Sequence, residues 1–144
     1  MRLKNRIAIV TGGGSGLGAG IAERFAEEGA RLVLADLNGA NAEAVAEKIR
    51  QGQAEAIAVE TDVTDYAAAG DLVARTIDKF GTVDILVNSA GTSRHMTFLD
   101  ANPEDFQAIM KVNLEGTMYC GQHAGRIMVK NGYGRIINIA SISG

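Results

Sequence analysis

The sequence has little cysteine and little proline, and it has no long hydrophobic run. Its single cysteine, Cys120, cannot form a disulfide within the chain, which fits a reducing compartment. No apolar run approaches the roughly 20 residues that span a bilayer. Residues 1–6 include three basic residues, and the apolar stretch after them reaches Gly12 at once and is too short for a signal peptide. We therefore expect a cytoplasmic protein that is not inserted in a membrane.

The chain also lacks a marked excess of either charge. Its 144 residues are 47% hydrophobic and 22% charged, with a formal net charge of -3. This is the composition of an ordinary globular protein, without the basic excess that nucleic acid or an anionic membrane attracts. No spacing of cysteine and histidine indicates a zinc site, so we expect no metal. The length suits one domain, residues 1–144.

Glycine is abundant, with 18 residues, and apolar runs alternate with helical patterns along the whole chain. The apolar runs predict five strands, at residues 7–11, 31–35, 56–60, 83–87 and 135–140. Helical spacing predicts a helix after each of the first four strands, with stops near Gly29, Gly52, Gly81 and Gly132. A polar loop from Gly91 to about Asn102 separates the fourth strand from its helix, which begins at Pro103 and continues towards Met128.

The strands are continuous apolar runs and do not alternate strictly between apolar and polar residues. This pattern is typical of strands that are covered on both faces, as in a parallel sheet between two layers of helices. Right-handed crossover connections between its strands would then give a doubly wound sheet, with helices on both faces. We therefore predict an α/β fold: a doubly wound parallel sheet of the Rossmann type, incomplete, with about five strands.

The turn after the first strand carries the strongest functional signal. Residues 11–18 read TGGGSGLG, and the candidate cofactor-binding residues in this stretch are Gly12, Ser15, Gly16, Leu17 and Gly18. Glycines permit a sharp turn, close approach of the backbone to a pyrophosphate, and tight packing of the helix on the sheet. The helix N-terminus adds free N–H groups that favour an anion. The alternative is a glycine-rich turn that binds no ligand.

Asp36 ends the second strand, 18 residues after Gly18. A carboxylate there can accept hydrogen bonds from both ribose hydroxyls of NAD and would repel the 2′-phosphate of NADP. The alternative is that Asp36 only caps a turn before Asn38 and Gly39, which are turn-forming residues. We predict that NAD is preferred over NADP.

The glycine spacing resembles the motif Thr-Gly-x-x-x-Gly-x-Gly of the short-chain dehydrogenase/reductase family, and further motifs follow in the family's order. Members that bind NADP often carry a basic residue where this chain has Ser15 or Leu37. Asp62 and Val63 match the family's Asp-Val pair, which implies that they bind the adenine ring. The alternative is that Asp62 belongs to the N-cap region of the next helix, for which Asp62 and Asp65 are both suited; the helical pattern predicts that Asp65 caps this helix.

The remaining family motifs lie in the second half of the chain. Residues 88–91, NSAG, resemble the family's Asn-Asn-Ala-Gly, which implies cofactor binding by Asn88, Ala90 and Gly91. Asn113 matches a helix asparagine that kinks the helix and positions a water molecule of the proton relay. Ser141 matches the serine that binds the substrate oxygen, because the family pattern Ser-x-x-Gly favours it over its rival Ser143. Both candidate catalytic residues, Asn113 and Ser141, are implied by the resemblance.

The family's acid/base motif, Tyr-x-x-x-Lys, does not occur in residues 1–144. The resemblance implies an oxidoreductase that moves hydride between NAD(H) and a small alcohol or carbonyl substrate, with a full-length parent that forms a dimer or tetramer. The 144-residue fragment itself is expected to be inactive. It is also expected to be poorly soluble, because its fifth strand would be an exposed apolar edge. The alternatives are a non-catalytic dinucleotide-binding module and an inert gene fragment.

Two histidines are not assigned to catalysis. His95 is interpreted as a solvated residue of the loop after the fourth strand. His123 is interpreted as a residue on a helix surface.

Overall fold

Strands and helices alternate along the chain as predicted. A computed structural model describes residues 1–94 and 97–141. Its strands are β1 (Ile7–Thr11), β2 (Arg31–Asp36), β3 (Ala56–Glu60), β4 (Ile85–Asn88) and β5 (Arg135–Asn138). Its α-helices are α1 (Gly16–Glu27), α2 (Gly39–Gln51), α3 (Tyr66–Phe80), α4 (Pro103–Met110) and α5 (Thr117–Asn131). A π-helical segment, η1 (Lys111–Gly116), joins α4 to α5.

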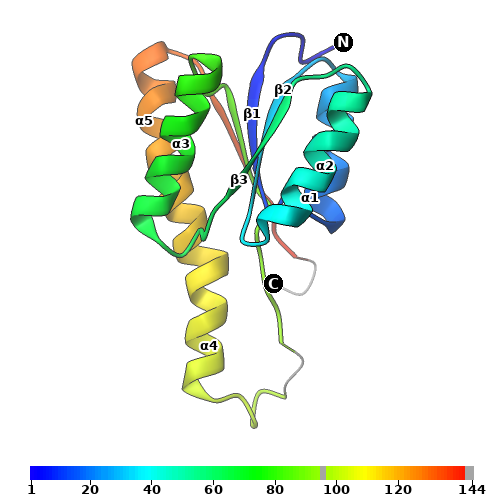
Figure 1. The fold of residues 1–144 in the computed structure, drawn as a ribbon. Coiled ribbons are helices and arrows are strands. Elements are labelled where there is room, and N and C mark those ends of the chain that lie inside the picture. The colour runs from blue at the N-terminus through cyan, green and yellow to red at the C-terminus, as the bar shows by residue number, and fades with distance from the viewer. Residues whose placement is uncertain (95–96, 142–144) are drawn as a thin grey trace.

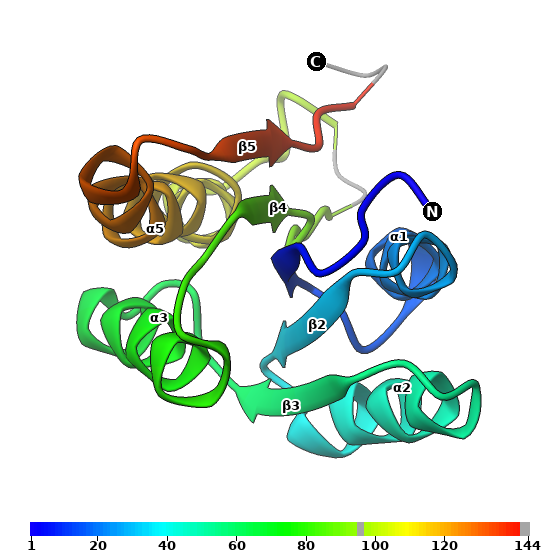
Figure 2. The same cartoon turned by 90° about the horizontal axis from the view of Figure 1, so that it is seen from above.

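The five strands form one sheet in the order β3-β2-β1-β4-β5, and every neighbouring pair is parallel. Helices α1 and α2 cover one face, and α3 and α5 cover the other (Figure 2). The predicted doubly wound fold is therefore confirmed. The strand order reverses between β1 and β4, and open sheets of this kind bind ligands in the crevice at that point, beyond the carboxyl ends of the strands.

The core consists of two layers, one on each face of the sheet. Ile9 and Leu86 pack with residues of α3 and α5, whereas Val10 and Leu34 pack with residues of α1 and α2. All five residues of β1 are buried. This is the reason for the continuous apolar runs: a central strand contacts helices through both of its faces, so both faces carry mainly apolar residues.

Three strands differ from the predicted bounds, β2 only in ending one residue later, at Asp36. β4 begins at Ile85, two residues later than predicted, and Asp84 lies just before it. The carboxylate of Asp84 accepts a hydrogen bond from the backbone N–H of Ile7 at 2.9 Å and forms an ion pair with Arg6. Asp84 therefore binds the start of β1 through its side chain. β5 ends at Asn138 because its partner β4 ends at the paired Asn88.

The helix predicted from Pro103 onward is interrupted. The structure divides it into α4, the π-helical segment η1 and α5, which ends at Asn131 with Gly132 in the left-handed conformation, φ 68°. Asn113 lies within η1, in agreement with the irregularity that the family resemblance implied. Figure 1 shows α4 projecting beyond the carboxyl ends of the strands, next to the loop that follows β4.

The edge of the sheet at β5 is exposed, as expected: Ile136 and Ile137 retain 44% and 42% of their accessible surface. His123 was predicted to lie on a helix surface, but its side chain is partly covered by the neighbouring helix. It is half-buried between α3 and α5, with its Nε2 3.1 Å from the backbone oxygen of Tyr66. His95 and Ser143 lie outside the described residues. Within the described part of the chain, no helix has the length and apolar character that crossing a membrane requires.

Candidate functional site

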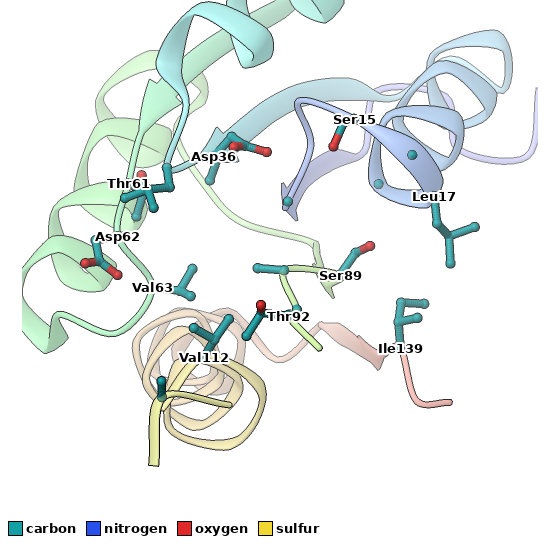
Figure 3. Close-up of a pocket in the computed structure, with 18 of the residues that line it drawn as sticks. Ser15, Leu17, Asp36, Thr61, Asp62, Val63, Ser89, Thr92, Val112 and Ile139 are labelled. Atoms are coloured by element: carbon teal, nitrogen blue, oxygen red, sulfur yellow. The ribbon is translucent and has the colours of Figure 1, made fainter. Parts of the chain in front are cut away.

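An elongated cleft of about 620 Å³ lies beyond the carboxyl ends of β1, β2 and β4. In Figure 3, Asp36, Asp62 and Val63 lie at one end of this cleft, and Leu17 and Ile139 point toward each other at the other end. The structure brings ten of the eleven predicted cofactor-binding residues together along its walls. They are Gly12, Ser15, Gly16, Leu17, Gly18, Asp36, Asp62, Val63, Ala90 and Gly91.

The glycine-rich turn connects β1 to α1 along one wall. A Cβ atom at Gly18 would lie 2.1 Å from the backbone oxygen of Gly12, so no side chain fits there. Gly12 has φ +65°, a conformation that L side chains rarely adopt. Ser15 stands at the N-cap of α1, and its hydroxyl makes no capping hydrogen bond. The turn therefore presents a helix N-terminus and one uncommitted hydroxyl to the cleft, a combination that suits a phosphate.

Asp36 faces the cleft from the end of β2. One carboxylate oxygen accepts a hydrogen bond from the N–H of Gly14 and the other from the N–H of Asn38, both at 2.9 Å. Asp36 thus caps the turn after β2, which was the alternative interpretation, and it also lines the cleft. Because each carboxylate oxygen can accept two hydrogen bonds, both oxygens keep the capacity to bind a further hydroxyl.

Asp62 and Val63 line the same end of the cleft. Asp62 accepts hydrogen bonds from the N–H and the hydroxyl of Thr64, whereas the N-cap of α3 is Asp65. The helix-starting role therefore belongs to Asp65, and Asp62 shapes the preceding turn. A Cβ at Gly116 would lie 2.7 Å from the side chain of Val63, so this glycine allows η1 to approach the cleft wall closely.

The turn after β4 is fixed by a residue that was not among the predicted site residues. The hydroxyl of Thr11 accepts hydrogen bonds from the N–H groups of Ser89 and Ala90, both at 3.1 Å. Thr11 is the first residue of the glycine motif quoted above, and this place in the motif is the sequence signal that could have identified it as a site residue. Asn88 is only 4% exposed and does not line the cleft. Its amide donates to the side-chain oxygen of Asn138 at 2.9 Å and so ties β4 to β5.

A second cavity, of about 530 Å³, adjoins the first and contains both predicted catalytic residues, Asn113 and Ser141. The amide of Asn113 pairs with both backbone groups of Thr92: it accepts from the N–H at 2.8 Å and donates to the carbonyl at 2.9 Å. The side chain of Asn113 thus anchors the loop after β4. Its backbone oxygen accepts a hydrogen bond from the hydroxyl of Thr117 at 2.9 Å.

The charges around the main cleft are mostly negative. Asp36 and Asp62 line it, and Arg94 is the one lysine or arginine on its walls within the described part of the chain. Arg94 forms an ion pair with Asp105 of α4. This contact links the loop after β4 to α4, and no pattern in the sequence indicated it.

Comparison with known proteins agrees with these motifs. The model of the short chain dehydrogenase family matches residues 6–144. The chain is 38% identical over 141 residues to the (2S)-[(R)-hydroxy(phenyl)methyl]succinyl-CoA dehydrogenase subunit BbsD of Thauera aromatica, covering 98% of this chain and 57% of that protein. It is 37% identical over 137 residues to the short-chain reductase protein NovJ of Streptomyces niveus, covering 95% and 52%.

A solved structure shares the fold. The crystal structure of gox2181 superimposes with a TM-score of 0.96 at 35% sequence identity, covering 99% of this chain and 56% of that chain. The chain therefore spans little more than half the length of the relatives that it matches.

Proposed function

The chain belongs to the short-chain dehydrogenase family, and on this basis we propose that it binds NAD(H) in an oxidoreductase acting on an alcohol/carbonyl pair. When bound, the nicotinamide ring supplies the hydride acceptor or donor. The chain's own residues bind the dinucleotide, orient the substrate oxygen and hold the loop after β4 in place. The lone cysteine, Cys120, supports a cytoplasmic location for such an enzyme.

The observation that carries this proposal is the continuity of the two cavities. The main cleft extends from Asp36 to Ile139, and the cavity that holds Ser141 shares part of its wall. The shared residues are Ser89, Ala90, Gly91, Thr92 and Ile139. An extended ligand bound at Asp36 can therefore reach the residues that the family uses for catalysis.

The residues along the main cleft fit a dinucleotide. The absence of side chains at Gly12 and Gly18 lets the backbone approach a pyrophosphate, and the N-terminus of α1 stabilises its charge. Asp36 is available to the hydroxyls of the adenosine ribose, and a carboxylate in this position disfavours a 2′-phosphate. We therefore propose NAD as the preferred cofactor.

The substrate end is assigned by the family motifs. Ser141 holds the substrate oxygen, and Asn113 keeps the loop after β4 in place beside the proton relay. Because residues 1–144 contain no Tyr-x-x-x-Lys, we expect this stretch on its own to reduce no carbonyl substrate. We propose that the full-length protein is a homo-oligomer. A dinucleotide-binding module without catalysis is the second candidate, and an inert fragment is the third.

Titration of the full-length protein with NADH and NADPH tests the cofactor assignment. We expect NADH to bind more tightly. Asp36→Asn should weaken NADH binding by about tenfold to a hundredfold, the usual cost of a lost charged hydrogen bond. It should also reduce the preference for NADH over NADPH. Asp71→Asn, which removes one exposed carboxylate from α3, should change neither affinity. Tighter binding of NADPH by the unchanged protein would contradict the assignment.

A further inference from the structure

A shallower depression of about 550 Å³ adjoins the Asp36 end of the main cleft. It shares Asp36 and Leu37 with that cleft, and its remaining wall includes Gly39 and Glu60. If the adenosine ribose lies against Asp36, as proposed above, a substituent on its 2′-oxygen would extend toward this depression. The residues here therefore bear on the choice between NAD and NADP.

The position of Glu60 is set by the sheet. Glu60 is the last residue of β3 and pairs in register with Asp36, the last residue of β2. Residues paired in register on neighbouring strands project their side chains from the same face of the sheet. The two carboxylates therefore leave the same edge of the sheet on the same side.

The carboxylate of Glu60 lies over the start of α2. A Cβ atom at Gly39, the first residue of α2, would be only 2.7 Å from Oε2 of Glu60. A helix N-terminus favours an anion, and the side chain of Glu60 already supplies one there. A phosphate that entered the depression would have to displace this charge or lie beside it.

In the part of the chain that the structure describes, no cation neutralises this pair of carboxylates. Within residues 1–94 and 97–141, no lysine, arginine or histidine forms an ion pair with Asp36 or Glu60, and none lines the depression. At the opposite end of these strands, Glu55, which precedes β3, does have a cationic partner, because it forms an ion pair with Arg31, the first residue of β2.

We propose that Glu60 is a specificity-determining residue, whose carboxylate acts with that of Asp36 to exclude the 2′-phosphate of NADP. This inference rests on the proposed NAD(H) site. NADH carries no charge at the 2′ position, so the penalty from Glu60 falls on NADPH alone. Since Glu60 is exposed, its effect is electrostatic and is screened by salt.

The test compares NADH and NADPH binding to the full-length protein and to three variants at low ionic strength. Glu60→Gln keeps the shape of the side chain and removes its charge. We expect the Kd for NADPH to fall about three- to tenfold, as for the loss of one partly screened charge. The Kd for NADH should stay within about twofold, because the 2′-hydroxyl is neutral. Raising the salt concentration should shrink the difference.

Two further variants separate charge from structure. Glu60→Asp retains the charge and should retain most of the discrimination. Asp71→Asn makes the same change in net charge on α3, and it should leave both affinities unaltered.

If Glu60→Gln leaves the ratio of the two Kd values unchanged while the unchanged protein binds NADH, this inference is wrong and the NAD site stands. Equal shifts for both cofactors would also overturn it, because they would show a structural effect. An unchanged protein that binds neither cofactor would contradict the proposed function itself.

Discussion

The first turn of α1 lies so close to the turn after β1 that Gly18 leaves no room for a side chain, and this supports a quantitative prediction. A methyl group at Gly18 would lie 2.1 Å from the oxygen and 2.8 Å from the carbon of the Gly12 carbonyl. Both atoms belong to the backbone, so no side-chain rotation relieves the overlap. Gly18→Ala should therefore force the helix and the turn apart. Forcing extra volume into a well-packed region typically costs about 1–3 kcal/mol, and we expect at least the upper end of that range here.

Gly20→Ala is the matched control. Gly20 lies on the exposed side of the same helix, and a Cβ atom there meets nothing within 4 Å. Alanine is the better helix former by about 0.5–1 kcal/mol, so this variant should be more stable than the unchanged protein. Urea unfolding of the full-length protein and both variants measures the two effects, and NADH titration should show weaker binding only for Gly18→Ala. Equal stability of Gly18→Ala and Gly20→Ala would refute the reasoning.

Three further predictions concern hydroxyl, thiol and carboxyl groups. Thr11→Val leaves two backbone N–H groups after β4 without their acceptor, and it should lower the free energy of unfolding in urea by about 2–4 kcal/mol. Thr76→Val is the control: it removes a hydroxyl that only donates within α3, so it should cost much less. Burial raises the pKa of the Cys120 thiol to about 11, so alkylation at pH 8 should require unfolding, and rapid labelling of the native protein would contradict this. A hydrogen bond from the backbone N–H of Arg2 holds the pKa of Glu28 below its ordinary 4.5. The ionised Glu28 carboxylate therefore stabilises the folded protein at neutral pH. This contribution is lost as the pH falls from 4.5 through the lower pKa that Glu28 has in the folded protein. Glu28→Gln should lower the free energy of unfolding at pH 7. If the difference in unfolding free energy between the variant and the unchanged protein stays the same in acid, this explanation is wrong.

Local patterns in the sequence predicted most of the fold. The apolar runs gave β1 and β3 with their correct bounds. The N-cap of α3 at Asp65 was also predicted correctly, because its carboxylate binds the N–H groups of Ala67 and Ala68 in the turn that follows. These features depend on residues close together in the chain, where periodicity and capping chemistry are informative.

The details that were missed depend on residues far apart in the chain. β4 begins late because Asp84 bonds to β1, 77 positions away. The hydrogen bond that Asp36 accepts from Gly14, 22 positions away, and the pairing of Glu60 with Asp36 likewise follow from the packing of the turn and from strand register, and not from a local pattern. The motif suggested that Asn88 contacts the cofactor, but its side chain is buried and holds β5. A motif indicates that a residue matters, whereas its contacts show whether it lines the site or supports it.

A crystal structure of the full-length protein with NAD⁺ tests the central claim most directly. We predict that the adenosine ribose lies against Asp36, that the pyrophosphate lies at the N-terminus of α1 beside Gly16 and Gly18, and that the nicotinamide reaches the cavity of Ser141. A dinucleotide bound in the opposite direction, or bound outside this cleft, would contradict the proposed site.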